Sequence, residues 1–291
     1  MRNAFIEELV ALAAMHTNIA LVVGDLGYSV IEPFVDSFPD RFVNAGVAEQ
    51  NMAGLAAGMA SEGYHVFTYS IANFPTFRCA EQIRNDIDHH RLPVTTVAVG
   101  GGVAYGNMGY SHHAVQDYAL MRAMPNMLLA APGDPHETRS CLRYLIDHPQ
   151  PSYLRLGKAG EPCFHDSDPV VAPGEWVAVA GEARDTDRVM LSTGAALGAA
   201  LKRAELSNHA VYSMPLWSMA SKAAQAERVA GLTELVTLED HLLDGGFGSW
   251  MAEGLIGTNG ASKLRAIALS ERVCDTVASQ AALNRLGGLA A

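Results

Sequence analysis

Short β-branched runs that alternate with longer helical patterns restrict the fold of this chain more than any other feature of its sequence. The runs are apolar and occur at residues 20–23, 64–69, 94–99, 127–131, 189–192, 210–212, 235–238 and 264–268. Helical patterns separate them, as at 49–61, 79–90 and 136–147. Continuous apolar strands with helical crossovers are typical of a parallel sheet covered on both faces. The chain is therefore predicted to be an α/β protein.

The segment 160–174 divides these elements into two groups. It contains three prolines, several acidic residues and little periodicity, as domain linkers often do. We therefore predict two domains, residues 1–165 and 175–291, each a mostly parallel sheet flanked by helices. Because this architecture supports many unrelated activities, function has to be inferred from the sites.

Charge and composition argue against several classes of partner. The net charge of −11 argues against nucleic acid, because phosphate binding needs clustered Lys and Arg. Four cysteines without a CxxC pair favour reduced thiols over a zinc site or a disulfide framework. Glu7 and Glu8 interrupt the first apolar run, which predicts an amphipathic helix rather than a signal peptide. No stretch reads as a membrane span, so we expect a soluble, cytoplasmic protein without a membrane partner.

A glycine-rich loop, GGGVAYGNMG, follows the predicted strand that ends at Val99. It fits neither the dinucleotide fingerprint nor the phosphate-loop pattern. It is either a flexible connection or a loop whose backbone approaches a ligand closely. His112 and His113 come just after it, near the carboxyl end of a parallel strand, where open α/β sheets bind ligands. A stand-alone nucleotide-binding protein remains an alternative that rests on this loop.

The run 43–60, VNAGVAEQNMAGLAAGMA, places Glu49 where a helix is predicted to begin. Taken locally, a glutamate in a first turn is explained by the helix dipole. The run also resembles the pyrimidine-binding domain of transketolases, in which a similar GxAEQxM segment carries the glutamate that activates thiamine diphosphate. The resemblance continues in order through GDLGYS (24–29), EQIRND (81–86), HHAVQDYALMRAMPNM (112–127), PSYLRLGK (151–158) and VTLEDHLLDGGFGS (236–249).

This resemblance covers nearly the whole chain and implies the C-terminal subunit of a split transketolase. Full-length relatives begin with a domain that holds the diphosphate through Mg²⁺, using a GDG segment followed by an asparagine. No segment here matches it. The resemblance therefore implies an N-terminal partner subunit that supplies the Mg²⁺ ligands, no metal ligand in this chain, and an α2β2 heterotetramer.

The resemblance also implies roles for residues of the cofactor site. Glu49 would hydrogen-bond N1′ of the aminopyrimidine. Asp25 would lie near the cofactor, and Leu26 would wedge it into its bent shape. Phe74 is the better candidate to stack on the pyrimidine and Phe77 the second, although either ring could simply belong to the core.

At the substrate end the sequence departs from the family pattern. Arg2 and Ser29 match phosphate-site positions, whereas Lys158 stands where an arginine is usual, which keeps the charge but loses the bidentate fork. Gly100 replaces a phosphate-contacting histidine, and Met108 replaces an aspartate that reads the acceptor's hydroxyl group. Such changes shift substrate choice, so a modified, differently charged or smaller sugar is expected.

The predicted activity is transfer of a two-carbon ketol unit from a ketose, as a phosphate or a modified sugar, to an aldehyde acceptor. By the same resemblance, His112 would transfer a proton at the substrate's reacting oxygens or orient them. Two alternatives stay open: a thiamine-dependent carboligase of the deoxyxylulose-phosphate synthase type, and a non-catalytic regulatory paralogue.

Overall fold

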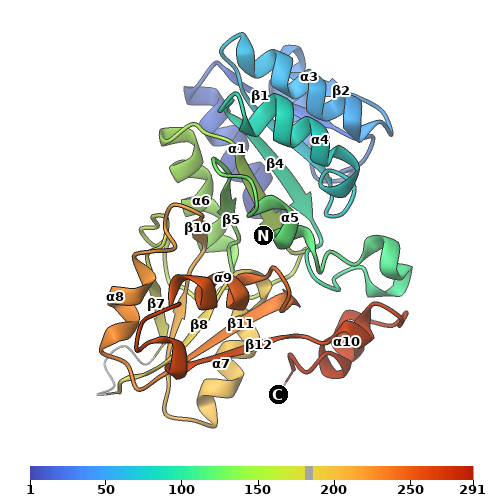
Figure 1. Cartoon of the computed structure of the whole chain (residues 1–291). Helices are drawn as coiled ribbons and strands as arrows, with labels where there is room; N and C mark the ends of the chain where they lie inside the picture. Colours follow the sequence, from blue (N-terminus) through green and yellow to red (C-terminus); the bar gives the residue numbers. More distant parts are fainter. Residues whose placement is uncertain (181–185, 291) are drawn as a thin grey trace.

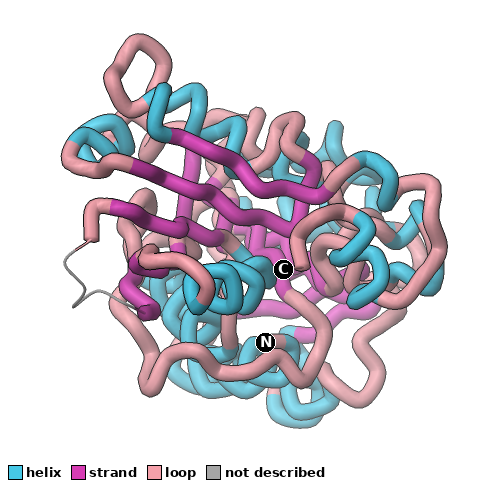
Figure 2. The backbone as a smooth tube through the Cα atoms, turned by 90° about the horizontal axis from the view of Figure 1, so that it is seen from below, coloured by secondary structure: helices cyan, strands magenta, loops and turns pink. Residues whose placement is uncertain are grey.

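The computed structural model describes residues 1–180 and 186–290, and it confirms an α/β fold with two mostly parallel sheets flanked by helices (Figure 1). Within these residues one sheet has seven strands in the order β10-β5-β6-β4-β3-β1-β2. The other has five, in the order β12-β11-β8-β9-β7. Figure 2 shows strands running through the middle of the molecule, with helices and loops outside them.

The seven-stranded sheet is parallel except at one edge, where β10 runs antiparallel to β5. Its strands are β1 (Ile19–Val23), β2 (Phe42–Asn44), β3 (His65–Ile71), β4 (Val94–Val99), β5 (Leu128–Ala130), β6 (Ser152–Leu156) and β10 (Leu216–Ser218). The predicted runs at 20–23, 64–69, 94–99 and 127–131 coincide with β1, β3, β4 and β5. By contrast, β2, β6 and β10 lie outside the predicted set, because β6 carries a buried arginine and β2 and β10 have only three residues each.

The five-stranded sheet contains the four predicted runs of the second half and one further strand. Its members are β7 (Val177–Ala180), β8 (Arg188–Ser192), β9 (Ala210–Ser213), β11 (Glu234–Leu242) and β12 (Leu264–Leu269). The additional strand, β7, lies at the edge and is antiparallel to β9, while the other pairs are parallel.

Helices cover both faces of the seven-stranded sheet. On one face α1 (Arg2–Met15) packs against α6 (Pro135–Asp147), and Phe5 and Leu9 meet Leu142 and Leu145 in one apolar cluster. On the other face, α3 (Glu49–Ser61) lies on β3 through buried alanines. The remaining helices are α2 (Glu32–Ser37), α4 (Ala80–Gln82), α5 (Asp117–Met121), α7 (Leu197–Glu205), α8 (Gln225–Ala230), α9 (Phe247–Gly254) and α10 (Gln280–Leu286).

Two predicted helices keep their type, and the third is irregular. The patterns at 49–61 and 136–147 become α3 and α6. The pattern at 79–90 becomes the short α4, continued by a π-helical stretch, Ile83–Asp88. No helix in the described part of the chain is long and apolar enough to cross a membrane.

A buried ion-pair network joins the two sheets. Arg155 on β6 donates from Nε to Asp117 Oδ2 at 2.7 Å and from Nη1 to Asp240 Oδ1 of β11 at 2.6 Å. Its side chain is only 2% exposed. Removing one member of such a network would leave a buried charge without compensation, so the three residues hold the sheets together as a unit.

Candidate active site

The carboxyl ends of five adjacent strands bring the predicted site residues to one edge of the seven-stranded sheet. Asp25 follows β1, Glu49 comes after β2, and Phe74 follows β3. Gly100 and Lys158 come just after β4 and β6. Because the strands run parallel in the order β6-β4-β3-β1-β2, these positions lie along one edge, where open α/β sheets bind their ligands.

Glu49 is the first residue of α3, and its side chain is only 1% exposed. A carboxylate at such depth needs polar partners, since burying an isolated charge is costly. Ser70 of β3 supplies a weak one, with its Oγ 3.4 Å from Glu49 Oε1. The strong partner is Arg78, whose Nη1 lies 2.6 Å from Glu49 Oε2. Burial, followed by the charge of Glu49, raises the pKa of neighbouring Cys79 to about 12, so this thiol stays protonated.

Phe74 lies between Arg78 and His112. The guanidinium carbon of Arg78 is 5.0 Å from the centroid of the Phe74 ring, and the His112 ring meets it edge-on at 5.2 Å. Phe77, the second stacking candidate, is 49% exposed. The structure therefore brings Phe74 into contact with one other predicted site residue, His112, and leaves half of the Phe77 side chain exposed.

The loop that carries His112 is fixed to the turn that carries Phe74. Asn73 donates through Nδ2 to the carbonyl oxygen of His113 at 2.5 Å and, more weakly, to that of Ser111 at 3.4 Å. The Nδ1 atom of His112 lies 2.9 Å from the Ser111 hydroxyl group. This contact orients the half-buried His112 ring through Nδ1.

The turn after β1 is held in a left-handed conformation at two non-glycine residues, Asp25 (φ 54°) and Ser29 (φ 64°). The Asp25 carboxylate accepts from Asn44 Nδ2 at 2.9 Å and from the Tyr28 hydroxyl group at 3.0 Å, and these bonds lower its pKa. The Ser29 amide donates to Glu32 at 2.7 Å. Backbone strain of this kind is often found at ligand sites, and side-chain hydrogen bonds stabilise it here.

A positively charged corner lies beside these residues. The Arg2 amide donates to the carbonyl oxygen of Lys158 at 3.3 Å, and the Lys158 ammonium lies 4.9 Å from the centre of the Tyr105 ring. Arg2 carries a buried Nε that has no hydrogen-bond partner in the described part of the chain. The Tyr105 ring covers Gly100, where an added Cβ would lie 2.0 Å from it. No sequence motif points to Tyr105, which fills the space that a histidine at position 100 would need.

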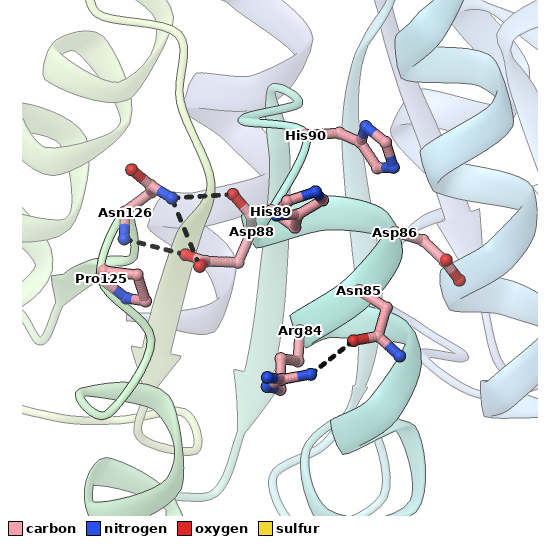
Figure 3. Close-up of a pocket in the computed structure, with 8 residues that line it drawn as sticks. All are labelled: Arg84, Asn85, Asp86, Asp88, His89, His90, Pro125 and Asn126. Atoms are coloured by element: carbon pink, nitrogen blue, oxygen red, sulfur yellow. Dashed lines mark hydrogen bonds between the residues drawn. The ribbon is translucent and has the colours of Figure 1, made fainter.

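A separate cavity of about 550 Å³ is lined by none of these residues (Figure 3). Figure 3 shows Asp88 facing Asn126, which donates to it through both its backbone and its side chain. His90 and Asn126 precede β4 and β5, so the cavity lies at the amino ends of the strands. The cavity is therefore at the opposite edge of the sheet from Glu49. The candidate functional site is the edge that carries the buried carboxylate of Glu49, and not this cavity.

Comparison with known proteins identifies the family. The sequence profile described as "Transketolase, pyrimidine binding domain" matches residues 1–160. A protein of Methanocaldococcus jannaschii named as a transketolase C-terminal section is 34% identical over 270 residues, covering 90% of this chain and 84% of the relative. The chain belongs to the transketolase family.

Two further relatives of this transketolase-family chain show how its length relates to theirs. One subunit of the apulose-4-phosphate transketolase of Phocaeicola vulgatus is 31% identical over 264 residues, covering 87% of this chain and 83% of that protein. A solved structure described as a split gene transketolase, inactive β4 tetramer, matches with a TM-score of 0.83 and 29% identity. The match covers 99% of this chain and 93% of that one. The chain thus corresponds to the C-terminal part of a transketolase, as the sequence resemblance implied.

One residue of the site has no sequence signal of its own. Arg78 lies outside the motifs that carry the family resemblance, yet it is the strong partner of Glu49 and contacts Phe74. An arginine near a helix start is ordinary in sequence, and only the fold brings its guanidinium to a buried carboxylate.

Proposed function

We propose that this chain is the C-terminal subunit of a split transketolase that transfers a two-carbon ketol unit from a ketose to an aldehyde acceptor. The observation that carries this proposal is the buried carboxylate of Glu49, which is linked through Arg78 to Phe74 and from there to His112, at the carboxyl edge of a transketolase-family sheet. Activity would require a partner subunit with the diphosphate- and Mg²⁺-binding domain. The relatives named as a C-terminal section and as a transketolase subunit support this requirement.

The residues present fit the pyrimidine half of thiamine diphosphate. They offer a buried carboxylate that can accept a hydrogen bond from a ring N–H group, with an aromatic ring close by. When bound, the cofactor supplies the carbanion chemistry of the reaction. Glu49 would hold the proton at N1′, Phe74 would stack on the ring, and Leu26 and Asp25 would support it. The Mg²⁺ ligands would lie on the partner subunit.

At the substrate end, His112 would exchange a proton with the reacting oxygen of the sugar through Nε2. Arg2, Ser29 and Lys158 would bind the distal end of the substrate. Two cations in a half-buried corner suit a phosphate or another anionic group. The Tyr105 ring fills the space next to Gly100 and so reduces the room for the distal end of the substrate. This favours a substrate different from a standard pentose phosphate.

The proposal is tested by reconstituting the complex. A tagged pull-down from native extract, with mass identification, should recover a chain of similar size that carries the GDG and asparagine motif. In that complex, Glu49→Gln should lower ketol transfer by about 10²- to 10⁴-fold, because the proton at N1′ is no longer controlled. Glu62→Gln, at the far, exposed end of the same helix, is the matched control and should leave the rate unchanged. An unchanged rate in Glu49→Gln would favour a non-catalytic regulatory paralogue.

A second candidate function is decarboxylating carboligation. The 1-deoxy-D-xylulose-5-phosphate synthase of Pelotomaculum thermopropionicum is 33% identical over 261 residues, although this chain spans only 40% of that protein. Carbon dioxide release from pyruvate by the reconstituted complex would favour this reaction, whereas ketose consumption without carbon dioxide would support ketol transfer.

Assembly and organisation complete the proposal. We expect an α2β2 heterotetramer, with residues 1–165 as the pyrimidine-binding domain and 175–291 as the C-terminal domain. The chain would work in the cytoplasm, where its four cysteines stay reduced. Light scattering of the purified complex measures its stoichiometry directly.

A further inference from the structure

We propose that the five-stranded sheet carries a second ligand site, which binds a phosphate dianion, free or as a monoester, between Arg188, Arg203 and Arg265. The site lies at the amino ends of the strands β8, β11 and β12. Glu49 and the other residues of the candidate active site lie along the seven-stranded sheet. The phosphate site therefore lies on a different sheet and would exist whether or not the proposed function holds.

One face of the five-stranded sheet gathers these side chains. Arg188 of β8 pairs in register with Glu234 of β11, and Arg265 of β12 pairs with Val236, two residues further along β11. Because side chains alternate between the faces of a strand, these four positions share one face. Helix α7 contacts β8 and β11, and Arg203 lies in its last turn. The three arginines and Glu234 line one cavity of about 260 Å³.

The lining of this cavity is positive, although the whole chain has a net charge of −11. Among the described residues that line it, Glu234 is the one carboxylate, against three arginines. His209 also lines the cavity, but burial, followed by the charge of Arg188, lowers its pKa and keeps it neutral near pH 7. Three arginines and one glutamate leave a net charge of +2. A phosphate monoester carries about −1.5 to −2 at pH 7 and balances this charge, whereas a carboxylate leaves part of it uncompensated.

Several N–H groups of the three arginines have no protein acceptor. Arg188 donates to Glu234 Oε2 from Nε at 2.9 Å and from Nη2 at 2.5 Å. Arg203 donates from Nη2 to the carbonyl oxygen of Gly288 at 2.8 Å, but its buried Nε has no hydrogen-bond partner among the described residues. Arg265 makes no hydrogen bond or ion pair with any residue in 1–180 or 186–290. Phosphate oxygens match such free guanidinium forks, and a buried donor gains most from an acceptor.

The size of the cavity limits the ligand to a small molecule. Its volume of about 260 Å³ is below the range of about 300–1,000 Å³ that is usual for larger ligands. Met190 and Leu206 add apolar surface to the lining, which suits the short carbon chain of a monoester. A nucleic acid is disfavoured, because the negative charge of the whole chain repels a polyanion.

The test is a titration of the ¹⁵N-labelled full chain with inorganic phosphate at constant ionic strength, followed through the amide NMR signals. Saturable shifts are expected around Arg188, Ser207 and Arg265. Arg265→Gln should weaken binding at least about tenfold, because it removes a free fork without breaking a contact within the fold. Arg272→Gln is the matched control: it removes the same charge from an exposed position outside the cavity and should leave the affinity unchanged.

Two further ligands define the chemistry of the site. Acetate, a monoanion, should bind more weakly than phosphate. Glycerol 3-phosphate distinguishes the sources: tighter binding than inorganic phosphate would assign the site to an organic monoester, and weaker binding would assign it to the free ion.

The proposal is overturned if the signals around the cavity do not shift, or if acetate shifts them as strongly as phosphate does. Equal binding by Arg265→Gln and Arg272→Gln would overturn it as well. Lys158→Gln separates this site from the proposed substrate corner, and it should leave the shifts around Arg265 unchanged. Shifts that disappear in Lys158→Gln would belong to that corner and would also contradict the proposal.

Discussion

At Gly100 the backbone and a neighbouring ring together exclude every side chain. Its φ of 86° lies in the left-handed region, and a Cβ would come 2.0 Å from the Tyr105 ring. Glycine at this position leaves room for the Tyr105 ring, which in turn lies 4.9 Å from the Lys158 ammonium. A histidine, which the sequence resemblance implies for this position, would not fit here unless the Tyr105 ring moved.

Gly100→Ala should destabilise the protein by about 1–2 kcal/mol for the left-handed backbone and by at least about 1 kcal/mol more for displacing the Tyr105 ring. Gly63→Ala separates the two costs. Gly63 has a φ of 98° and no atom within 4 Å of an added Cβ, so it should show the backbone cost alone. Urea unfolding of both variants measures the difference, and equal losses would contradict the steric argument.

The first turn of α6 gathers buried titratable groups around the chain segment that leads to the second sheet. Asp134 caps the helix by accepting from the Glu137 amide at 2.8 Å, and it also accepts from His165 Nδ1 at 3.0 Å. Glu137 Oε2 accepts from the Gly133 amide at 2.6 Å and from the Ser213 hydroxyl group at 3.0 Å. Burial raises the pKa of Glu137 from 4.5 to about 7.

This raised pKa means that Glu137 contributes stability that is lost as pH rises from about 5 to 7, whereas buried His65, whose pKa is lowered to about 4, contributes with the opposite sign. Between the two pKa values of Glu137, the folded state holds a proton on this residue that the unfolded state has already released. The contribution to stability is therefore complete below the pKa of the unfolded state and is lost as pH rises through the pKa of the folded state. The gap between 4.5 and about 7 corresponds to about 3.5 kcal/mol at about 1.4 kcal/mol per pH unit. The pKa of His165 is also raised, which has the same sign.

Glu137→Gln cannot titrate, so between pH 5 and 7 its stability should fall less, or rise more, than that of the wild type when unfolding is measured in urea at pH 5, 6 and 7. Glu62→Gln, an exposed carboxylate, is the control and should keep the wild-type slope. Parallel curves for the wild type and Glu137→Gln would show that another group carries the pH dependence.

The sequence predicts strands well where every residue of the strand is buried. It predicts site residues well where they belong to a family motif. The strands β3 and β4 are buried along nearly their whole length, so their apolar runs are clear. The strand β6 was missed because Arg155 interrupts its pattern, although its partners Asp117 and Asp240 satisfy it from distant parts of the chain. The role of Arg78 could not be predicted either, because its partner Glu49 lies 29 residues away in the sequence and only the fold brings the two together.

At the scale of the whole molecule, the Arg155 network couples the sheet that carries the site to the five-stranded sheet. Arg155 also donates from Nη2 to the carbonyl oxygens of Ala114 and Asp240, at 2.8 and 3.2 Å. Ala114 follows the histidine loop directly. The junction between the sheets therefore lies close to the substrate side of the proposed site.

Arg155→Met should cost about 3–5 kcal/mol in the free energy of unfolding, because two buried carboxylates lose the cation that compensates them and Asp117 keeps only its hydrogen bond from the Tyr153 hydroxyl group. Addition of Asp117→Asn and Asp240→Asn to the same chain should recover part of this loss by removing the charges. Chemical denaturation of the single and triple variants measures both effects. A loss below about 1 kcal/mol in Arg155→Met would show that water or a neighbouring group replaces the guanidinium.

The antiparallel strand β10 restricts where chimeras between this chain and a relative can be joined. It comes after the segment 160–174, yet Leu216–Ser218 pairs with Leu128–Ala130 at the edge of the other sheet. A recombinant carrying a foreign second half must therefore match that short strand to β5, or leave β5 as an open edge that invites aggregation. Successful chimeras would cross over before Leu128 or beyond Ser218, so that both strands come from one parent.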